Sequence, residues 1–261
     1  MELVVWAILV LISLLLVGLL SRWIHDNPSG DFESGVLYRV GRLYVRLVHR
    51  LKVNGQDHIP NTRAPGPLIV IANHTAGIDP ILIQSVCPFE IRWIMAHDMR
   101  EPRLEWFWRW KKIIFVSRGE QQSMGLRRAL DHLKLGGVLG IFPEGGLERP
   151  PQQILPFYPG LGLLVRKSGA RVLPVFIDGT PQVDPAWASL WHPSHSSVTF
   201  SPPTTLCHLP AAEISTTLRQ QFLDLSGWPA NDTPAQVDGD TQKVPGCMGK
   251  TASTSKHRSV A

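Results

Sequence analysis

Residues 73–80 read NHTAGIDP, and they place a histidine and an aspartate directly after the apolar run PLIVIA. A carboxylate that accepts a hydrogen bond from one imidazole nitrogen fixes the tautomer, which makes the other nitrogen a better base. His74 and Asp79 therefore have the residue types and the spacing to activate a hydroxyl nucleophile. A structural interpretation fits equally well: Asp79 caps a helix that begins with Pro80, and His74 is a loop residue.

Two further stretches carry polar groups after apolar runs. In GIFPEGGLERP, residues 140–150, Gly145 and Gly146 allow backbone N–H groups to approach a ligand. Glu144 can accept a hydrogen bond from a substrate hydroxyl, although a plain turn has the same Pro and Gly content. The missing GK[ST] ending excludes an NTPase phosphate loop. Arg118 ends the run IIFVSR, where a guanidinium can bind a phosphate or form a surface ion pair.

Between residues 53 and 209, short apolar runs alternate with helix-like stretches. This alternation predicts an α/β fold, in which a single domain has a largely parallel sheet flanked by helices. The polar residues that follow the strands then fall at one side of the sheet. The expected strands are PLIVIAN, IRWIMA, KIIFVS, VLGIF, RVLPVFI and SVTFS, and the expected helices are 80–86, 100–110, 123–135, 159–168 and 210–225. We expect the domain to span residues 53–228.

The first residues have the composition of a membrane segment. No residue from Leu3 to Leu20 is charged, and at about 1.5 Å per residue this run spans most of a ~30 Å hydrocarbon core. A cleaved signal peptide would need a basic start and a cleavage site of small residues, whereas position 2 is Glu. We therefore expect residues 1–24 to form an uncleaved anchor. Because Arg22 follows the run and no Lys or Arg precedes it, the positive-inside rule places the rest in the cytoplasm.

Residues 33–52 predict a basic amphipathic helix, because apolar residues recur at three- and four-residue spacing with arginines between them. Such a helix can lie on an anionic membrane surface, or it can pack on the domain with a solvated charged face. The sequence does not decide between these two interpretations. After Trp228 the chain has few large apolar residues and no periodicity, which predicts a disordered tail over residues 229–261.

The composition is that of a folded chain with a moderate basic excess. Hydrophobic residues make up 44% of the chain and charged residues 18%, which is enough apolar surface for a core. The net charge of +5 suits a partner that carries phosphates. Lipid headgroups fit this charge better than nucleic acid, because the sequence has no recognisable nucleic-acid module. The three cysteines are far apart, which argues against a disulfide framework.

The chain resembles the 1-acylglycerol-3-phosphate acyltransferase family in the order and spacing of its motifs, namely NHTAGID (73–79), FVSR (115–118), FPEGG (142–146) and VLPVFI (172–177). The resemblance covers roughly residues 50–205. It implies that His74 is a general base, which takes the proton from an acceptor hydroxyl. That hydroxyl attacks the thioester carbonyl of acyl-CoA or acyl carrier protein, and Asp79 orients the histidine.

The resemblance also implies roles for other residues. Arg118 would bind the phosphate of the acceptor. Glu144 and Gly145 would position the acceptor, and Pro174 would lie in the acyl-donor region. The reaction needs no metal and no bound cofactor, because thioester cleavage is already favourable and the enzyme supplies positioning. The implied partners are membrane lipids and the acyl donor.

The loop after Glu144 departs from the family pattern. Gly146 and Leu147 stand where the family usually has Thr and Arg, and Ser117 stands where an Asp often precedes the arginine. We therefore expect the acceptor to be 1-acylglycerol-3-phosphate, another lysolipid, or an amine- or hydroxyl-bearing lipid. Arg149 can substitute for the missing guanidinium if the loop folds back.

We therefore expect a membrane-anchored O-acyltransferase whose catalytic domain faces the cytoplasm. Two alternatives use the same residues. One is an acyl thioesterase, in which the His74–Asp79 pair activates water, and the other is a non-catalytic membrane protein that binds lipid. Nothing in the sequence indicates an oligomeric state.

Overall fold

The computed structural model describes residues 1–116 and 122–233. Short 3-10 turns lie at Gln56–His58, His97–Met99, Pro102–Leu104 and Ala186–Trp191. The helices and strands of the described residues, in chain order, are α1 (Glu2–His25), α2 (Phe32–Leu47), β1 (Lys52–Asn54), β2 (Leu68–Ala72), α3 (Asp79–Val86), β3 (Ile91–Ala96), α4 (Glu105–Trp110), β4 (Ile114–Val116), α5 (Gln122–Lys134), β5 (Val138–Ile141), α6 (Pro159–Ser168), β6 (Arg171–Asp178), β7 (Ser197–Phe200) and α7 (Ala211–Ser226).

The strands form a seven-stranded sheet in the order β1-β7-β6-β2-β5-β3-β4. The five strands from β6 to β4 run parallel to one another, and β7 pairs antiparallel with β6. All five residues of β2, LIVIA, are buried, as is usual for a central parallel strand with helices on both faces. The predicted α/β fold with a largely parallel sheet is confirmed.

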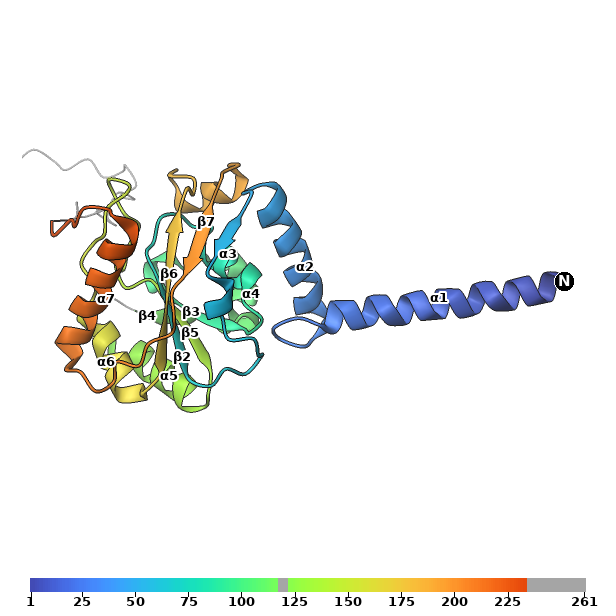
Figure 1. Ribbon diagram of the computed structural model, residues 1–261, viewed down its shortest axis with the longest axis horizontal. Helices are drawn as coiled ribbons and strands as arrows, with labels where there is room; N and C mark the ends of the chain where they lie inside the picture. Colours follow the sequence, from blue (N-terminus) through green and yellow to red (C-terminus); the bar gives the residue numbers. More distant parts are fainter. Residues whose placement is uncertain (117–121, 234–261) are drawn as a thin grey trace, which may run out of the picture.

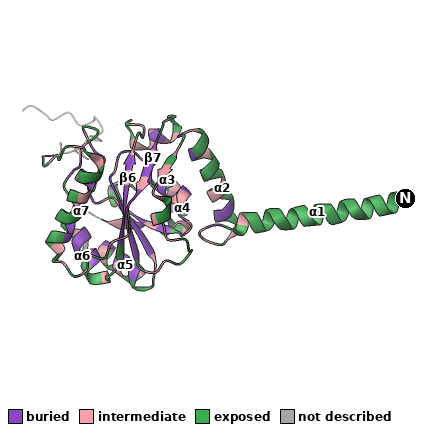
Figure 2. Ribbon diagram, viewed as in Figure 1, coloured by how far each residue is buried: buried purple, intermediate pink, exposed green. Residues whose placement is uncertain are grey.

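Helices cover both faces of this sheet (Figure 1), and the strands between them are largely purple, and therefore buried, in Figure 2. Alternate residues of a strand point to opposite faces. Leu68 and Val70 accordingly pack in the cluster beneath α2 and α3. Ile69 and Ile71 pack in the second cluster, beneath α5, α6 and α7. The domain therefore has two apolar layers separated by the sheet.

The sequence prediction differs from the structure at three places. Helix α2 ends at Leu47, and Lys52, which the amphipathic pattern assigned to that helix, begins the short strand β1. The helix expected over 100–110 begins only at Glu105, after a 3-10 turn. All six predicted strands are present.

The third difference concerns the beginning of the predicted disordered tail. The carbonyl oxygen of Pro229 accepts a hydrogen bond of 3.1 Å from the N–H of Ile154, and the N–H of Asn231 donates one of 3.1 Å to the Ile154 carbonyl. These bonds attach residues 229–233 to the domain, contrary to the prediction. The remainder of the predicted tail, residues 234–261, lies outside the described residues.

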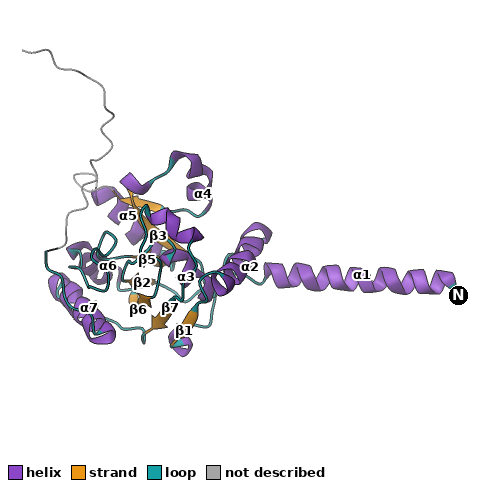
Figure 3. Ribbon diagram, turned by 90° about the horizontal axis from the view of Figure 1, so that it is seen from above, coloured by secondary structure: helices purple, strands orange, loops and turns teal. Residues whose placement is uncertain are grey.

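Helix α1 is long and apolar enough to cross a membrane, and none of its residues is buried against the domain. It projects away from the sheet in both views (Figure 1, Figure 3). Its last turn nevertheless has a fixed contact with α2. A Cβ atom at Gly35 would lie 2.1 Å from the carbonyl oxygen of Ile24, so only glycine permits this close approach. Arg39 donates hydrogen bonds of 2.7 Å to the carbonyl oxygens of Trp23 and Asp26.

The apolar face predicted for α2 is divided between two surroundings. Val45 is buried in the core, and Tyr44 packs against the same cluster. The remaining large apolar side chains of this helix stay exposed, and they are Phe32, Val36, Leu37, Val40, Leu43 and Leu47. Packing on the domain therefore accounts for only part of the apolar face.

Substitution of Phe222 by Ala tests the second apolar layer. Phe222 on α7 is fully buried and contacts the ring of Phe157 edge-on, so we expect a loss of about 3–5 kcal/mol in the free energy of unfolding. The measurement is the thermal unfolding midpoint of the full chain in detergent. Leu225→Ala, on a more exposed side of the same helix, is the control and should change the midpoint little. Equal effects of the two substitutions would contradict this packing.

Candidate active site

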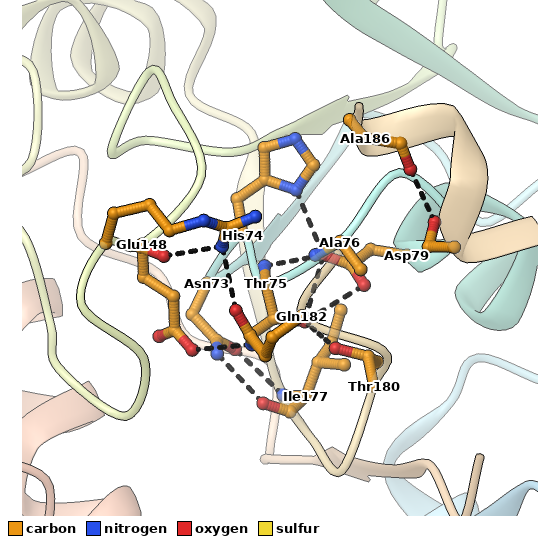
Figure 4. A network of polar contacts seen from close by, with 12 residues as sticks. Asn73, His74, Thr75, Ala76, Asp79, Glu148, Ile177, Thr180, Gln182 and Ala186 are labelled. Carbon is orange, nitrogen blue, oxygen red and sulfur yellow. Dashed lines mark hydrogen bonds and ion pairs between the residues drawn. The ribbon is translucent and has the colours of Figure 1, made fainter. Parts of the chain in front are cut away.

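His74 lies in the loop that follows β2, and Asp79 begins α3. The Nδ1 atom of His74 is 3.0 Å from Oδ2 of Asp79. Because a carboxylate only accepts hydrogen bonds, Nδ1 is the donor, and in the neutral imidazole the lone pair is then on Nε2. The Asp79 side chain is fully buried, whereas 22% of the His74 side chain is exposed. Nε2 has no hydrogen-bond partner among the described residues and points out of the polar network (Figure 4).

Groups other than the histidine also hold the Asp79 carboxylate. It accepts hydrogen bonds from the backbone N–H groups of Thr75 and Ala76, at 2.7 and 2.9 Å. The Thr75 hydroxyl donates a further one of 3.1 Å. These donors compensate the desolvation of a buried carboxylate. The prediction that Asp79 caps α3 is wrong, because the N-cap residue is Ile78 and the carboxylate turns back to the preceding loop.

Strand β6 and the segment after it hold the loop in place. Asn73 is fully buried, and its side-chain amide donates to the Ile177 carbonyl at 2.9 Å and accepts from the Ile177 N–H at 2.8 Å. The amide thus replaces a backbone pair and extends the β2–β6 contact past the end of β2. Two residues after Asn73, the hydroxyl of Thr75 lies 2.5 Å from that of Thr180 (Figure 4). The loop therefore leaves the sheet in a defined direction.

The imidazole ring of His74 stacks on the residue that follows β5. The ring centroids of His74 and Phe142 are 4.0 Å apart with an interplanar angle of 15°. Phe142 stacks in turn on Trp93 of β3, with centroids 4.9 Å apart. The backbone also contributes, because the N–H of Glu148 donates a 2.8 Å hydrogen bond to the His74 carbonyl. Stacking and hydrogen bonding together fix the plane of the imidazole and the direction of Nε2.

Two further carboxyl groups are buried beside this pair. Burial, together with the nearby carboxyls of Glu148 and Asp79, raises the pKa of Glu144 well above its ordinary value. The backbone amide of His74 opposes this shift, but neither carboxyl oxygen of Glu144 has a partner in hydrogen-bonding geometry among the described residues. Burial also raises the pKa of Glu148 to about 7, although its Oε1 accepts bonds from Gln152 and Gln182. Glu144 is thus a buried carboxyl that the His74 backbone amide stabilises electrostatically and that no described residue binds in full hydrogen-bonding geometry.

The two glycines after Glu144 differ in the space around them. Gly145 has φ +69°, and a Cβ atom there would lie 2.1 Å from the ring of Tyr158. Position 145 therefore accepts only glycine. A Cβ atom at Gly146 would meet nothing within 4 Å, so this position has room for a larger side chain.

Arg149 is engaged by the segment between β6 and β7. Its guanidinium donates to the Glu148 carbonyl at 2.7 Å and to the side-chain oxygen of Gln182 at 2.8 Å. It also forms an ion pair of 3.3 Å with Asp184. These contacts join the FPEGG loop to the segment that carries Thr180. A phosphate ligand would have to compete with them for Arg149.

The two remaining predicted site residues differ in what the structure describes. Arg118 lies outside the described residues. Pro174 is buried inside β6, in register with Ile71 of β2, three residues before His74 along that neighbouring strand. Among the described residues, no group of three His, Cys, Asp or Glu side chains is placed to hold a metal ion.

Several residues of the network were not predicted from the sequence. Thr75 lies inside the NHTAGIDP stretch, so a search for donors to a buried Asp79 could have found it. Phe142 precedes the predicted loop directly, but an apolar residue at a strand end is ordinarily a core residue. No local sequence pattern marks Glu148, Thr180 or Gln182 as site residues, because their contacts join chain segments that are far apart in the sequence.

Comparisons with known proteins bear on the family and the fold. Residues 50–178 match the family model described as Acyltransferase. The chain is 31% identical over 184 residues to a protein named Taffazin from Dictyostelium discoideum. That alignment covers 60% of this chain and 64% of the relative, so the chain spans less than two thirds of that protein.

A solved structure has the same architecture. The crystal structure of the 1-acyl-sn-glycerophosphate (LPA) acyltransferase PlsC from Thermotoga maritima is similar to this chain with a TM-score of 0.60. The match covers 76% of this chain and 82% of that chain, at 24% sequence identity. This similarity confirms the predicted fold class.

The substitution Glu148→Gln tests the raised pKa of this buried carboxyl, which lies beside the His74–Asp79 pair. A pKa raised to about 7 in the folded state means that folding takes up a proton between this value and the ordinary value of 4.5. The contribution of Glu148 to stability is therefore complete below about pH 4.5 and is lost as the pH rises through 7. Glutamine does not titrate, so the variant should gain stability relative to the wild type between about pH 5 and pH 8, on the order of 2 kcal/mol.

The measurement is the unfolding midpoint of both proteins at the two pH values, with Glu213→Gln on the exposed side of α7 as the control. A difference between Glu148→Gln and the wild type that does not change with pH would contradict the assignment.

Proposed function

We propose that the protein transfers a fatty acyl group to a hydroxyl of a lysolipid, a proposal supported by the match of residues 50–178 to the Acyltransferase family model. The acyl donor in this proposal is acyl-CoA or acyl carrier protein. The observation that carries the proposal is the His74–Asp79 hydrogen bond of 3.0 Å, with a buried carboxylate behind a partly exposed imidazole. This arrangement supplies a base whose free nitrogen is open to a ligand.

In the proposed reaction, the acceptor hydroxyl gives its proton to Nε2 of His74 while its oxygen adds to the thioester carbonyl carbon. The tetrahedral intermediate then expels the thiolate, which takes the proton from the imidazolium. The products are the ester and the free thiol, and His74 returns to its starting state. Asp79 stabilises the imidazolium without taking the proton. No metal and no bound cofactor enters these steps.

The acceptor proposed is 1-acylglycerol-3-phosphate or a related lysolipid. The similarity to PlsC, a 1-acyl-sn-glycerophosphate acyltransferase, supports this class. Glu144, whose buried carboxyl oxygens have no partner among the described residues, is proposed to position the acceptor together with Gly145. Arg118 and Arg149 remain candidates for binding the phosphate of the acceptor. Pro174 is buried within the sheet, so any effect on the acyl donor would act through the packing of β6.

We further propose that α1 anchors the protein in a membrane, with the domain on the cytoplasmic side. The exposed apolar residues of α2 support this location, since they continue the apolar surface of α1 onto the domain. A lysolipid acceptor would then reach the site from the bilayer to which the enzyme is attached.

His74→Ala should lower kcat for acyl transfer by roughly 10²–10⁴-fold, because it removes the base. The assay follows release of free thiol and formation of the acylated product, with and without a panel of lysolipids. His192→Ala, an exposed histidine on the same chain, is the control and should keep wild-type turnover. Near-normal acyl transfer by the His74 variant would contradict the proposed mechanism. Thiol release that does not depend on a lysolipid would instead indicate a thioesterase.

Leu147→Arg should improve the use of a phosphate-bearing acceptor. The substitution returns the guanidinium that the family usually has after the FPEG segment, and one charge-assisted contact corresponds to roughly a tenfold lower KM. The measurement is KM for 1-acylglycerol-3-phosphate and for a lysolipid without a terminal phosphate. Leu147→Gln introduces a polar side chain without the charge and serves as the control. An equal change for both acceptors would contradict an acceptor phosphate near position 147.

A further inference from the structure

A polar hollow lies at the opposite end of the sheet from His74. Its volume is about 250 Å³, and its lining includes Pro28 and Ser29 of the α1–α2 connection and Val138 at the start of β5. The candidate active site follows the other end of β5, at Phe142. Because the strand rises about 3.3 Å per residue, the two sites are separated by more than roughly 10 Å. The hollow therefore does not belong to the active site.

The lining of this hollow is basic. Its cationic residues are Arg63, Arg92, Lys111 and Lys112, whereas Glu90 is the carboxylate among the lining residues. Two of these cations already have partners. Arg63 pairs with Asp26 at 2.6 Å, and Lys111 lies 3.6 Å from Glu90.

Within the part of the chain that the structure describes, the side chains of Arg92 and Lys112 form no hydrogen bond and no ion pair, although the charge of Glu90 acts on Arg92. Both line the same hollow, together with His132. Burial lowers the pKa of His132, the Val138 carbonyl and Glu90 oppose this shift, and the positive charges of Arg92 and Lys112 add to it. Burial lowers the pKa of Arg92 itself, which Glu90 partly opposes. A partly buried guanidinium that no carboxylate contacts directly, together with an ammonium in the same lining, favours an anionic ligand.

The hollow continues toward the membrane helix. Arg63 lines it and also lines a second hollow, formed with Leu19, Arg22 and Trp23 of α1. The connection between the helices is rigid, because the buried Asn27 side chain bonds the carbonyl oxygens of Ile24 and Asp31 at 3.0 and 2.8 Å. The basic surface therefore extends from the last turn of α1, where a bilayer surface would lie, into the domain.

We propose that this hollow binds the phosphate headgroup of an anionic membrane lipid, with Arg92 and Lys112 as its principal contacts. The proposal uses the membrane anchor given above, but it is independent of the acyl-transfer chemistry. The lipid occupies a site at the amino end of the sheet, away from the reacting groups. It holds the domain at a fixed height and orientation against the bilayer, beside α1.

The test uses the full chain in lipid nanodiscs of phosphatidylcholine alone or with phosphatidic acid. Native mass spectrometry after release measures how much lipid stays bound. The wild type should retain phosphatidic acid in preference to phosphatidylcholine. Arg92→Gln with Lys112→Gln should lower this retention by roughly tenfold or more. Arg166→Gln with Lys167→Gln, an equal loss of charge on the exposed side of α6, is the matched control and should retain lipid as the wild type does.

Equal loss in the two double variants, or no preference of the wild type for the anionic lipid, would overturn the proposal. Displacement of phosphatidic acid by submillimolar inorganic phosphate or free coenzyme A would also overturn it, because the site would then take a soluble phosphate. Lys112→Gln alone, at an exposed position, gives a smaller loss and keeps the test valid if Arg92→Gln does not fold. Acyl transfer is not measured, so a failure here is distinct from a failure of the proposed reaction.

Discussion

The Asp79 carboxylate is the group on which the rest of the site depends. An ionised carboxylate removed from water is strongly unfavourable unless donors replace the water. Here the donors are the Nδ1–H of His74, the N–H groups of Thr75 and Ala76, and the Thr75 hydroxyl. They all belong to one short loop, so satisfying the carboxylate also folds the loop. The same bonds that make the charge tolerable fix the tautomer and direction of the base.

The parallel sheet supplies this loop with rigid surroundings. Residues that follow β2, β5 and β6 meet at one edge, which is the usual location of sites in α/β sheets. Asn73 ties the loop to β6, and Phe142 after β5 supports the imidazole. The basic hollow beside α1 lies at the other end of β5. One domain thus has the His74–Asp79 pair at one edge of the sheet and a basic hollow at the other.

The strands and the His74–Asp79 pair were predictable because they depend on local patterns. Buried runs such as LIVIA have few interpretations, and a five-residue spacing is short enough to bring the pair together. The capping role of Asp79 was predicted wrongly, since local sequence does not show which side of the helix start the carboxylate faces. The contacts of Arg149 with Gln182 and Asp184 join segments that meet only in the folded chain, so no local pattern could show them.

The central claim is that His74 and Asp79 act as one unit in proton transfer. When two residues act as a unit, removing either one abolishes their joint contribution to kcat, so the effects of the two substitutions do not add. The direct measurement is kcat for acyl transfer by His74→Ala, Asp79→Asn and the double variant. Circular dichroism first verifies that each variant is folded. The account predicts that the double variant is no slower than His74→Ala alone. A double variant whose loss equals the product of the two single losses would show that the residues act independently and would contradict the account.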